Sequence, residues 1–173
     1  MQHVSTMLLD TPAGRLYLAS DAEGICEVRA AQERDTENGV PCGLLEEAAG
    51  ELLDYFAGRK KRFDVPLSLH GTDFERSVWQ ALLEIPFGEV RSYGQIAAQI
   101  GKSGAARAVG GACSRNPVLI IVPCHRVVAA SGALTGFAAG MDMKRRLLAH
   151  EGWQVFEKRI GNQAGYRNQI EIR

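Results

Sequence analysis

One cysteine of this chain stands in a sequence context that favours reactivity. Cys124 follows the aliphatic residues 118–122 and Pro123, and it directly precedes His125 and Arg126. Pro123 lacks a backbone N–H and fixes φ near −65°, so strand pairing should end there and present Cys124 at the tip of a rigid apolar element. A cysteine thiol has a reference pKa of about 8.5, and cationic neighbours lower it. The context therefore predicts a nucleophilic thiol with a lowered pKa.

The residues around Cys124 also indicate how its proton is removed. Successive residues of an extended chain point to opposite faces, which disfavours a direct ion pair between Cys124 and His125. A relay is easier, in which His125 takes the proton through a bridging water and a carboxylate orients its other nitrogen. Glu151, just after a helix expected over residues 141–149, is the candidate, with an exposed acid at a helix end as the alternative. The remaining cysteines are expected to be small core residues: Cys26, Cys42 and Cys113.

The segment before Cys124 predicts a helix-turn-helix. Ser92 and Gln95 fit a capping box that opens a short helix ending at Gly101, and a second helix is expected over residues 104–114. This second helix offers only Arg107 on a surface of alanine and glycine, whereas reading base edges needs several Arg, Asn or Gln side chains. Such a surface favours close docking on DNA with little sequence reading, and tight helix packing inside the core is the alternative. Arg107 is hard to bury without a partner, which favours DNA.

The charge distribution supports the same assignment. The net charge is zero, but residues 1–85 carry 8 Lys/Arg against 15 Asp/Glu, and residues 86–173 carry 12 against 5. The split favours a polyanionic partner for the second half. A dipolar protein whose halves attract each other is the alternative.

The rest of the pattern predicts an α/β domain followed by a mostly α-helical one. Residues 1–70 combine three short strands with a helix, and the strands are expected over residues 4–9, 15–19 and 25–30, with the helix over 44–56. A capping box at Thr72 and Glu75 opens the second domain, residues 71–153. Residues 154–173 are polar and are expected to form a loosely packed surface tail.

Composition excludes several classes of protein. With 46% hydrophobic and 23% charged residues, the chain is neither a disordered nor a fibrous protein. It shows no membrane-length apolar run, no secretory signal and no CxxC pair, so we expect a cytoplasmic protein without membrane contact. His3, Cys26 and His70 do not complete a four-ligand zinc set, so we expect neither a metal nor a cofactor.

Together these motifs resemble the O6-alkylguanine-DNA alkyltransferases, also called methylated-DNA–protein-cysteine methyltransferases. The resemblance covers residues 74–153, with motifs in the family's order and spacing, and residues 1–70 match in pattern only. It implies a ribonuclease-H-like N-terminal domain and a winged-helix-like C-terminal domain. The motifs are Ile85-Pro86-Phe87-Gly88, Ser92-Tyr93-Gly94-Gln95-Ile96-Ala97, Ala105-Ala106-Arg107-Ala108-Val109-Gly110, Asn116-Pro117, Ile121-Val122-Pro123-Cys124-His125-Arg126-Val127 and Leu147-Leu148-Ala149-His150-Glu151-Gly152.

The resemblance implies direct-reversal DNA repair in a single turnover. Cys124 would take the alkyl group from O6-alkylguanine, and activity on O4-alkylthymine stays open. His125 would deprotonate Cys124 through water, Glu151 would orient His125, and Asn116 would brace the turn carrying Cys124. The alternatives are a non-catalytic protein that binds alkylated DNA and a Cys-His hydrolase, which would need a directly paired histidine.

The resemblance also implies a way of binding double-stranded DNA. The protein would bind through the minor groove with little sequence specificity, flip the alkylated guanine and place Arg107 in the vacated stack. It would act as a monomer in solution, with clustering on DNA left open. The other implied DNA contacts are Ser92, Tyr93, Gln95, Ser103, Ala105, Ala106 and Gly110.

The implied substrate pocket consists of Tyr93, Val127, Phe137, Ala138 and Lys144. Backbone carbonyls of Cys124 and Val127 would hold the exocyclic amine of the base. Tyr93 would push on the 3′ phosphate and donate its hydroxyl to the base. Many family members carry tyrosine where this chain has Phe137, so a hydroxyl contact is lost there and the tolerance for bulky alkyl groups is open.

Overall fold

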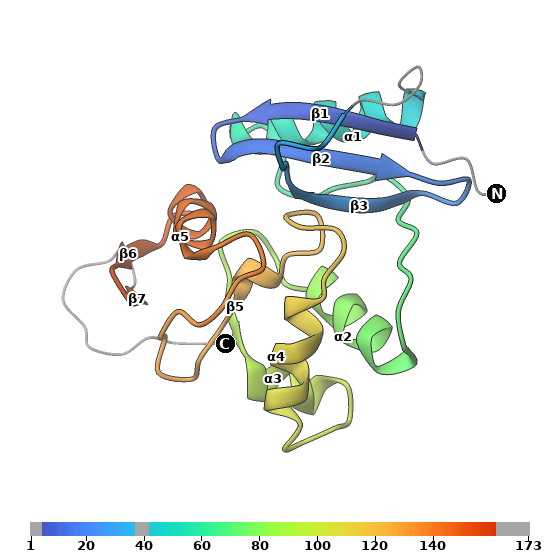
Figure 1. The fold of residues 1–173 in the computed structure, drawn as a ribbon. Coiled ribbons are helices and arrows are strands. Elements are labelled where there is room, and N and C mark those ends of the chain that lie inside the picture. The colour runs from blue at the N-terminus through green and yellow to red at the C-terminus, as the bar shows by residue number, and fades with distance from the viewer. Residues whose placement is uncertain (1–4, 37–41, 162–173) are drawn as a thin grey trace. The chain divides into compact units, whose positions relative to one another are not determined.

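The computed structural model describes residues 5–36 and 42–161, and the chain divides into two compact units (Figure 1). One unit comprises Met1–His70 together with Pro117–Ile121. The other comprises Gly71–Asn116 and Val122–Arg173. The chain therefore returns to the first unit for five residues just before the reactive segment.

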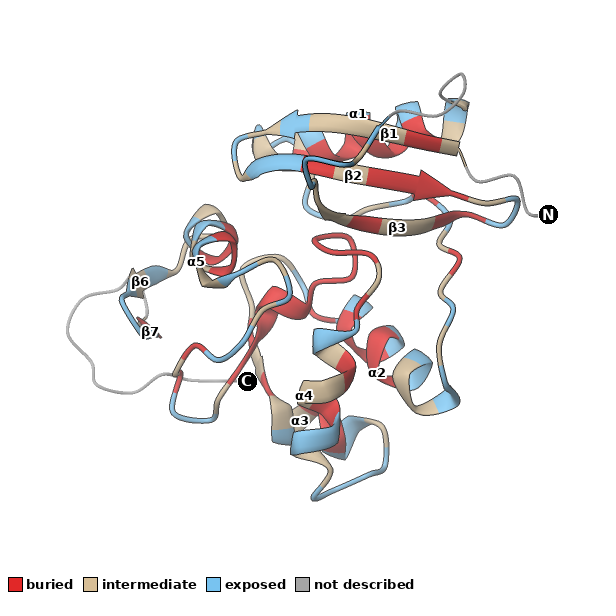
Figure 2. Ribbon diagram, in the orientation of Figure 1, coloured by how far each residue is buried: buried red, intermediate tan, exposed pale blue. Residues whose placement is uncertain are grey.

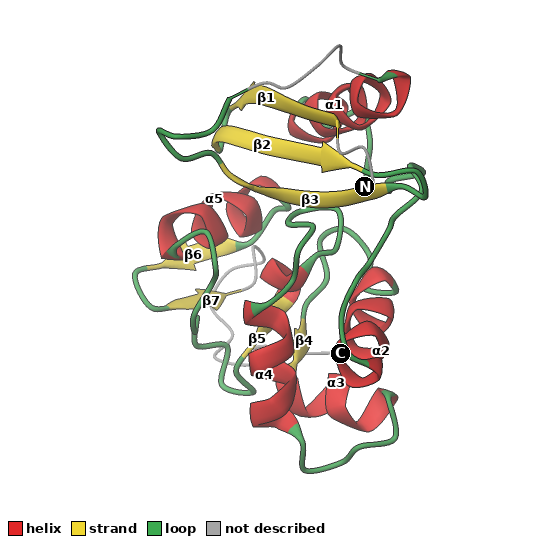
Figure 3. Cartoon of the chain, turned by 45° about the vertical axis from the view of Figure 1, so that its right-hand side comes forward, coloured by secondary structure: helices red, strands yellow, loops and turns green. Residues whose placement is uncertain are grey.

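The first unit is a three-stranded antiparallel sheet with one helix on it (Figure 3). Strands β1 (Ser5–Thr11), β2 (Gly14–Ser20) and β3 (Ile25–Ala30) pair in that order, and α1 (Gly43–Phe56) packs against them. Leu16 and Leu18, two residues apart on the central strand, are fully buried, as are Leu45 and Leu52 of the helix. Alternate residues of a strand share one face, so this spacing gives the sheet its apolar side. The predicted α/β domain is confirmed.

The aliphatic run before Cys124 is buried but forms no regular strand. Val118 makes an isolated parallel bridge to Val28, whose backbone N–H donates to the carbonyl of Pro117. Ile120 has φ of +73°, the only positive φ at a non-glycine residue in the described part of the chain. That conformation is unfavourable for a β-branched residue, so the surrounding packing must enforce it. After this run the chain enters the second unit again at Val122.

The second unit begins with three helices, α2 (Asp73–Leu83), α3 (Tyr93–Gln99) and α4 (Ala106–Ser114). Both predicted capping boxes are present: Thr72 with Glu75 opens α2, and Ser92 with Gln95 opens α3. An N-cap of this kind stabilises a helix by about 1 kcal/mol. Past the end of α3, Gly101 has φ of +70°, the left-handed conformation that favours glycine there.

One buried aromatic side chain joins the first and third of these helices. Trp79 of α2 is 2% exposed, and its indole N–H donates to the carbonyl of Ala112 on α4 at 2.9 Å. A buried indole is stabilised by such a partner. The helix-turn-helix formed by α3 and α4 is thereby anchored on α2.

The remaining elements carry the reactive segment and the C-terminal end of the unit. They are β4 (Arg91–Ser92), the 3₁₀ turn η1 (Cys124–Arg126), β5 (Val127–Val128), α5 (Met141–His150), β6 (Gln154–Phe156) and β7 (Arg159–Gly161). β4 pairs with β5 in parallel, and β6 with β7 antiparallel. The buried residues of η1 and β5 are coloured red in Figure 2.

The expectation of a loosely packed tail is wrong for residues 154–161. Ile160 of β7 is fully buried in a cluster with Leu134 and Leu148. Residues 162–173 lie outside the described part of the chain. Within the described part, no helix combines the length and the apolar character needed to cross a bilayer.

Candidate active site

The sulfur of Cys124 is buried and accepts a hydrogen bond from the side chain of Asn116. Cys124 opens the turn η1 and is 3% exposed. The side-chain amide of Asn116 donates to the carbonyl of Val122 at 2.8 Å and to the Cys124 sulfur at 3.1 Å. Asn116 follows α4, so the residue that braces the turn is itself fixed by the helix-turn-helix.

Burial makes the thiol of Cys124 a weaker acid than its sequence neighbours suggest. Desolvation raises the pKa of Cys124 to about 11, opposed by the Asn116 hydrogen bond and the charge of Lys144. The expected lowering is therefore wrong, because burial disfavours a thiolate and Arg126 directs its guanidinium elsewhere. At neutral pH the thiol is protonated, and a base must remove its proton.

His125, the residue after Cys124, forms a completely buried hydrogen-bonded pair with Glu151. His125 Nε2 lies 2.7 Å from Glu151 Oε1, and neither side chain is exposed. Burial alone would raise the pKa of Glu151, but His125 and Arg126 hold it well below its usual range. The carboxylate is thus ionised and accepts hydrogen bonds only, so Nε2 of His125 must donate the proton between them.

The other ring nitrogen of His125 is left with a free electron pair. Burial lowers the pKa of His125, so the ring is neutral at pH 7. With the proton on Nε2, Nδ1 is the acceptor, and it is buried without a hydrogen-bond partner among the described residues. A buried polar atom without a partner costs about 1–3 kcal/mol of stability. A hydrogen bond from a bridging water to Nδ1 would remove this cost, so water binding there is favoured.

Arg126 holds the Glu151 carboxylate, a role that sequence reasoning missed. Its Nε donates to both carboxylate oxygens, at 3.1 and 2.9 Å, and its Nη2 donates to Oε1 at 2.9 Å. Its Nη1 donates to the carbonyl of Ile85 at 2.6 Å, and the backbone N–H of Gly88 donates to Oε2 at 3.0 Å. Hydrogen bonds to most of the polar atoms of a buried ion pair are needed to offset the cost of removing both charges from water. A buried carboxylate needs a cationic partner, so a buried Glu151 would have pointed to a nearby arginine such as Arg126.

Lys144 is the second buried cation of the site. It is 0% exposed on α5, and its ammonium donates to the carbonyls of Val127 at 2.7 Å and Thr135 at 3.0 Å. Burial lowers the pKa of Lys144 to about 8, opposed by the sulfurs of Cys124 and Cys113. Its positive charge therefore acts on the sulfur that has to ionise.

Tyr93, the first residue of α3, and Thr135, in the loop before α5, are called the rim of the site. The Tyr93 hydroxyl lies 2.8 Å from Thr135 Oγ1, and a Cβ on Gly110 would lie 3.7 Å from the tyrosine ring. Phe137 is half-buried and Ala138 exposed in the loop that leads to α5. The place of Phe137 and Ala138 in the substrate pocket stays a prediction.

Cys113 was expected to be a plain core residue, but it lies near the reactive sulfur. It is half-buried on α4, three residues beyond Gly110. Burial and the proximity of Cys124 raise the pKa of Cys113 to about 12. It is therefore a poor nucleophile beside a better one.

The predicted DNA-contacting residues divide into two groups. Arg107, in the first turn of α4, and Ser103 are exposed, and Ala105, Ala106 and Gly110 are half-buried. Ser92 and Gln95 instead use their side chains to cap α3: Gln95 N donates to Ser92 Oγ at 3.1 Å, and Ser92 N donates to Gln95 Oε1 at 2.8 Å. Their contact with DNA stays a prediction.

The considered zinc residues do not gather in the described structure. His70 Nε2 lies 3.0 Å from Asp21 Oδ2 and 2.9 Å from the Ser68 hydroxyl. His3 lies outside the described residues. Among the described residues, no group of three or more His, Cys, Asp or Glu side chains is arranged to hold a metal ion.

These features define a class of protein: a helix-turn-helix unit, preceded by a ribonuclease-like domain, with a buried cysteine next to a histidine–glutamate pair. Two family descriptions match the chain, the ribonuclease-like domain of 6-O-methylguanine DNA methyltransferase over residues 4–69 and its DNA-binding domain over residues 73–153. The chain belongs to the 6-O-methylguanine DNA methyltransferase family.

Individual relatives agree with this assignment. A methylated-DNA–protein-cysteine methyltransferase of Methanosarcina acetivorans is 48% identical over 151 residues, covering 84% of this chain and 96% of that protein. One of Mycobacterium tuberculosis is 50% identical over 147 residues, covering 83% and 89%. The crystal structure of the M. tuberculosis O6-methylguanine methyltransferase superposes with a TM-score of 0.79 at 47% identity, covering 86% of this chain and 93% of that one. Another structure of the M. tuberculosis protein is in complex with DNA, with a TM-score of 0.76 at 49% identity, covering 86% and 92%.

Proposed function

We propose that this protein repairs DNA by moving the alkyl group of O6-alkylguanine onto its own Cys124, once per molecule. The observation that carries the proposal is the buried series of Cys124, His125, Glu151 and Arg126. A sulfur whose pKa is about 11 needs a base, and a neutral imidazole with an unpartnered Nδ1 is the base next to it in the chain. The names and DNA complex of the relatives support the same activity.

The reaction is a single displacement. One bridging water carries the Cys124 proton to His125 Nδ1, and Lys144 stabilises the thiolate. The sulfur then attacks the alkyl carbon, so that a carbon–sulfur bond forms as the carbon–O6 bond breaks and its electron pair leaves with O6. The base takes up one proton, passed on from His125, and becomes guanine. The thioether has no proton to lose and is a poor leaving group, so the protein acts once.

The alkylated base must leave the duplex to reach a sulfur that is 3% exposed. Extruding a nucleotide costs a few kcal/mol, which contacts with the opened duplex must offset. The small residues of α4 allow close approach from the minor groove, and the exposed Arg107 is placed to fill the gap in the stack. The base would then lie between Tyr93 and the loop that carries Phe137.

Replacing Arg107 by alanine should slow repair in duplex DNA by about 10- to 100-fold, which corresponds to about 1.4–2.8 kcal/mol of stabilisation of the flipped state. Free O6-methylguanine base needs no flipping, so the rate of transfer from it should change little. Single-turnover rates on both substrates measure this. Lys102→Ala, which removes an exposed charge from the preceding turn, serves as control. Equal slowing on the two substrates would contradict the stacking role.

Replacing His125 by alanine should shift the pH profile of alkyl transfer to alkaline pH. Without the imidazole, Cys124 must lose its proton to solvent, and its pKa is raised to about 11 by burial. The rate of transfer from free O6-methylguanine base should then be far below that of the parent protein at pH 7 and rise up to about pH 11. His150→Ala removes a half-buried histidine from the end of α5 as control. An unshifted profile for His125→Ala would remove this residue from the relay.

The stoichiometry of repair separates the proposed function from its alternatives. The protein is mixed with excess duplex containing one O6-methylguanine, and restored guanine is quantified after digestion of the DNA. We expect one guanine per protein molecule and no further turnover. Many guanines per protein would indicate a hydrolase, and binding without restored guanine would indicate a non-catalytic DNA-binding protein. Size measurement during the same titration tests a monomer in solution against clustering on DNA.

A reducing compartment such as the cytoplasm is part of this proposal. All four cysteines are free thiols. Oxidation of Cys124 would remove the nucleophile, so repair in this form requires a reducing environment.

A further inference from the structure

The C-terminal hairpin of β6 and β7 is hydrogen-bonded to the loop that carries Thr135 of the rim. The backbone N–H of Leu134 donates to the carbonyl of Lys158 at 2.9 Å, and the backbone N–H of Ile160 donates to the carbonyl of Gly132 at 3.1 Å. Loop residues 132–134 therefore pair with the hairpin as an extra strand would. The hairpin lies beyond the last residue, 153, of the matched DNA-binding domain.

Apolar packing also fixes the contact between the hairpin and loop residues 132–134. Ile160 is 0% exposed and Leu134 is 9% exposed, in a buried cluster with Val90, Val128 and Leu148. Val128 directly follows Val127, whose carbonyl receives the ammonium of Lys144. The hairpin core and the wall of the site are thus adjacent along one short strand.

Loop residues 132–134 are followed directly by Thr135 of the rim. Thr135 follows Leu134; its carbonyl accepts from Lys144 at 3.0 Å, and its hydroxyl lies 2.8 Å from that of Tyr93. Beyond it, Gly136, Ala138 and Gly140 are exposed. The contact with the hairpin therefore ends where the contact with the site begins.

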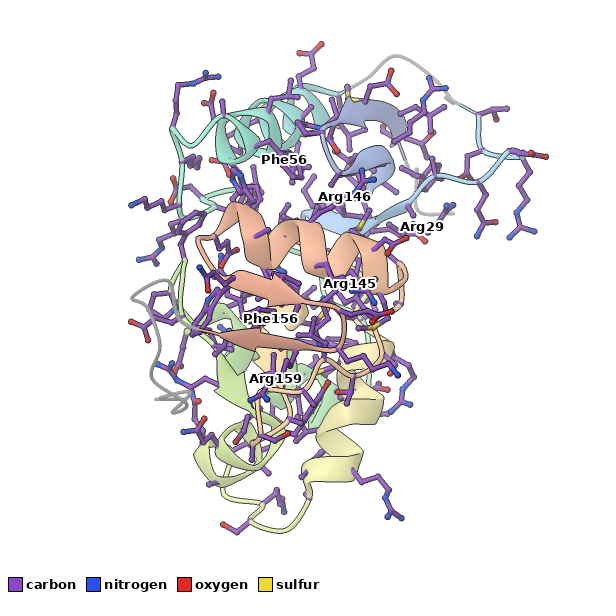
Figure 4. All side chains as sticks on the ribbon, turned by 90° about the vertical axis from the view of Figure 1, so that its left-hand side faces the viewer. Arg29, Phe56, Arg145, Arg146, Phe156 and Arg159 are labelled. Carbon is purple, nitrogen blue, oxygen red and sulfur yellow. The ribbon has the colours of Figure 1, made fainter. Side chains whose placement is uncertain are left out.

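Helix α5 is hydrogen-bonded to the turn of the hairpin. Arg145 donates through Nε and Nη2 to the carbonyl of Glu157, at 3.1 and 2.9 Å, and it follows Lys144 along the helix. Ala133 makes an antiparallel bridge to Arg159 of β7. Figure 4 views this side of the unit, with Arg145, Phe156 and Arg159 labelled.

We propose that the hairpin β6–β7 is a positioning element that makes the site selective for small alkyl groups. It holds Thr135, and through it the Tyr93 hydroxyl and the Lys144 ammonium, at a fixed place around the reactive sulfur. A rim fixed at this point limits the room beside Cys124 and keeps a methyl carbon in line with it. The inference rests on the proposed function, because it concerns the substrate of that site.

Replacing Ile160 by alanine in the full-length protein tests the proposal. A small displacement of reacting groups lowers a rate strongly, so we expect methyl transfer from duplex O6-methylguanine to slow by about 10-fold. Transfer of the bulkier benzyl group from duplex O6-benzylguanine should slow by less than about 2-fold, because a loosened rim leaves it more room. The methyl-to-benzyl rate ratio should therefore fall about 5-fold or more, and Ile160→Val should restore most of it. Rates are normalised to active protein by titration with excess substrate.

Matched variants separate positioning from stability. Arg145→Ala releases the hairpin turn without opening the core and should shift the ratio in the same direction by a smaller factor, even where Ile160→Ala fails to fold. Glu157→Ala alters an exposed side chain of the same turn but keeps the carbonyl that Arg145 binds, and should leave the ratio unchanged. Equal slowing of both substrates in Ile160→Ala or Arg145→Ala, or no change in either, overturns the proposal.

Hydrogen exchange keeps this test distinct from that of the proposed function. The amide of Leu134 is hydrogen-bonded to Lys158, so it should exchange slowly in the parent protein and about 10-fold or more faster in Arg145→Ala. A parent protein that transfers no alkyl group overturns the proposed function, whatever the exchange result. A parent protein that transfers alkyl groups while its Leu134 amide exchanges freely overturns only the proposed positioning role of the hairpin.

Discussion

Replacing Cys124 by alanine is expected to abolish alkyl transfer while leaving DNA binding within a few-fold of the parent protein. The sulfur supplies the bond that forms, and no other described group combines a nucleophile with the His125–Glu151 pair. Arg107 and Ala108 of α4 are exposed and Ala106 and Gly110 are half-buried, so this face of the helix should bind DNA without the sulfur. Transfer is measured by restored guanine in duplex DNA, and binding by fluorescence anisotropy of the same duplex.

Cys113→Ala is the matched control for this prediction. Cys113 lies near the reactive sulfur, but burial and Cys124 raise its pKa to about 12, and it should not accept the alkyl group. Cys113→Ala should retain transfer of one group per molecule. Residual transfer in Cys124→Ala that disappears in the double variant would show that Cys113 also acts as an acceptor.

Replacing Glu151 by glutamine should combine a large loss of rate with a large loss of stability. The amide has the shape of the carboxylate but lacks its charge, which leaves the buried Arg126 guanidinium without a counter-charge. Breaking a buried ion pair from one side costs about 3–5 kcal/mol. The amide N–H₂ also competes to donate to His125 Nε2, which moves the ring proton to Nδ1 and removes the base. We expect transfer to slow by about 10²–10⁴-fold, the usual contribution of a general base.

The stability loss of Glu151→Gln should depend on pH in a defined way. Because the folded-state pKa of Glu151 is held well below its usual range, the carboxylate stabilises the fold above its unfolded pKa, about 4.3. That contribution is lost as the pH falls through the range below this value. The difference in unfolding free energy between parent and variant should thus be largest near pH 7 and shrink below about pH 4, measured by urea denaturation. The exposed Glu157→Gln should show no such difference, and a difference independent of pH would contradict the assigned ionisation.

Features set by residues close in sequence were predictable. The capping boxes at Thr72 and Ser92 depend on a partner three residues away, and both are present. The strands of the first unit follow from alternation and turn residues, which act over a few positions. The helix-turn-helix was found in the same way, with boundaries shifted by about two residues.

Features set by packing were not predictable from neighbours in the chain. Sequence proximity to His125 and Arg126 indicated a lowered thiol pKa, but burial decides the pKa of Cys124 and raises it. Arg126 lies two residues after Cys124 in sequence, yet it binds Glu151, 25 residues away. Burial and long-range pairing come from the tertiary fold, and a single sequence does not contain them in readable form.

The hairpin was missed for a related reason. Its strands are three residues each, and the buried Ile160 stands between exposed Arg159 and half-buried Gly161. Such a short segment shows too little alternation to indicate a strand. Lys144 was assigned to the pocket by family resemblance alone, and the structure adds that it is fully buried and bonded to Val127 and Thr135.

Peptide mapping after reaction with an O6-methylguanine duplex tests the central claim most directly. Trypsin cleaves after Arg107, Arg115 and Arg126, so Cys113 and Cys124 fall in different peptides, residues 108–115 and 116–126. We expect a single added methyl group, about 14 Da by its formula, on the sulfur in residues 116–126, in step with the restored guanine. A methyl group in residues 108–115, or restored guanine with neither peptide changed in mass, would contradict the assignment of Cys124 as the acceptor.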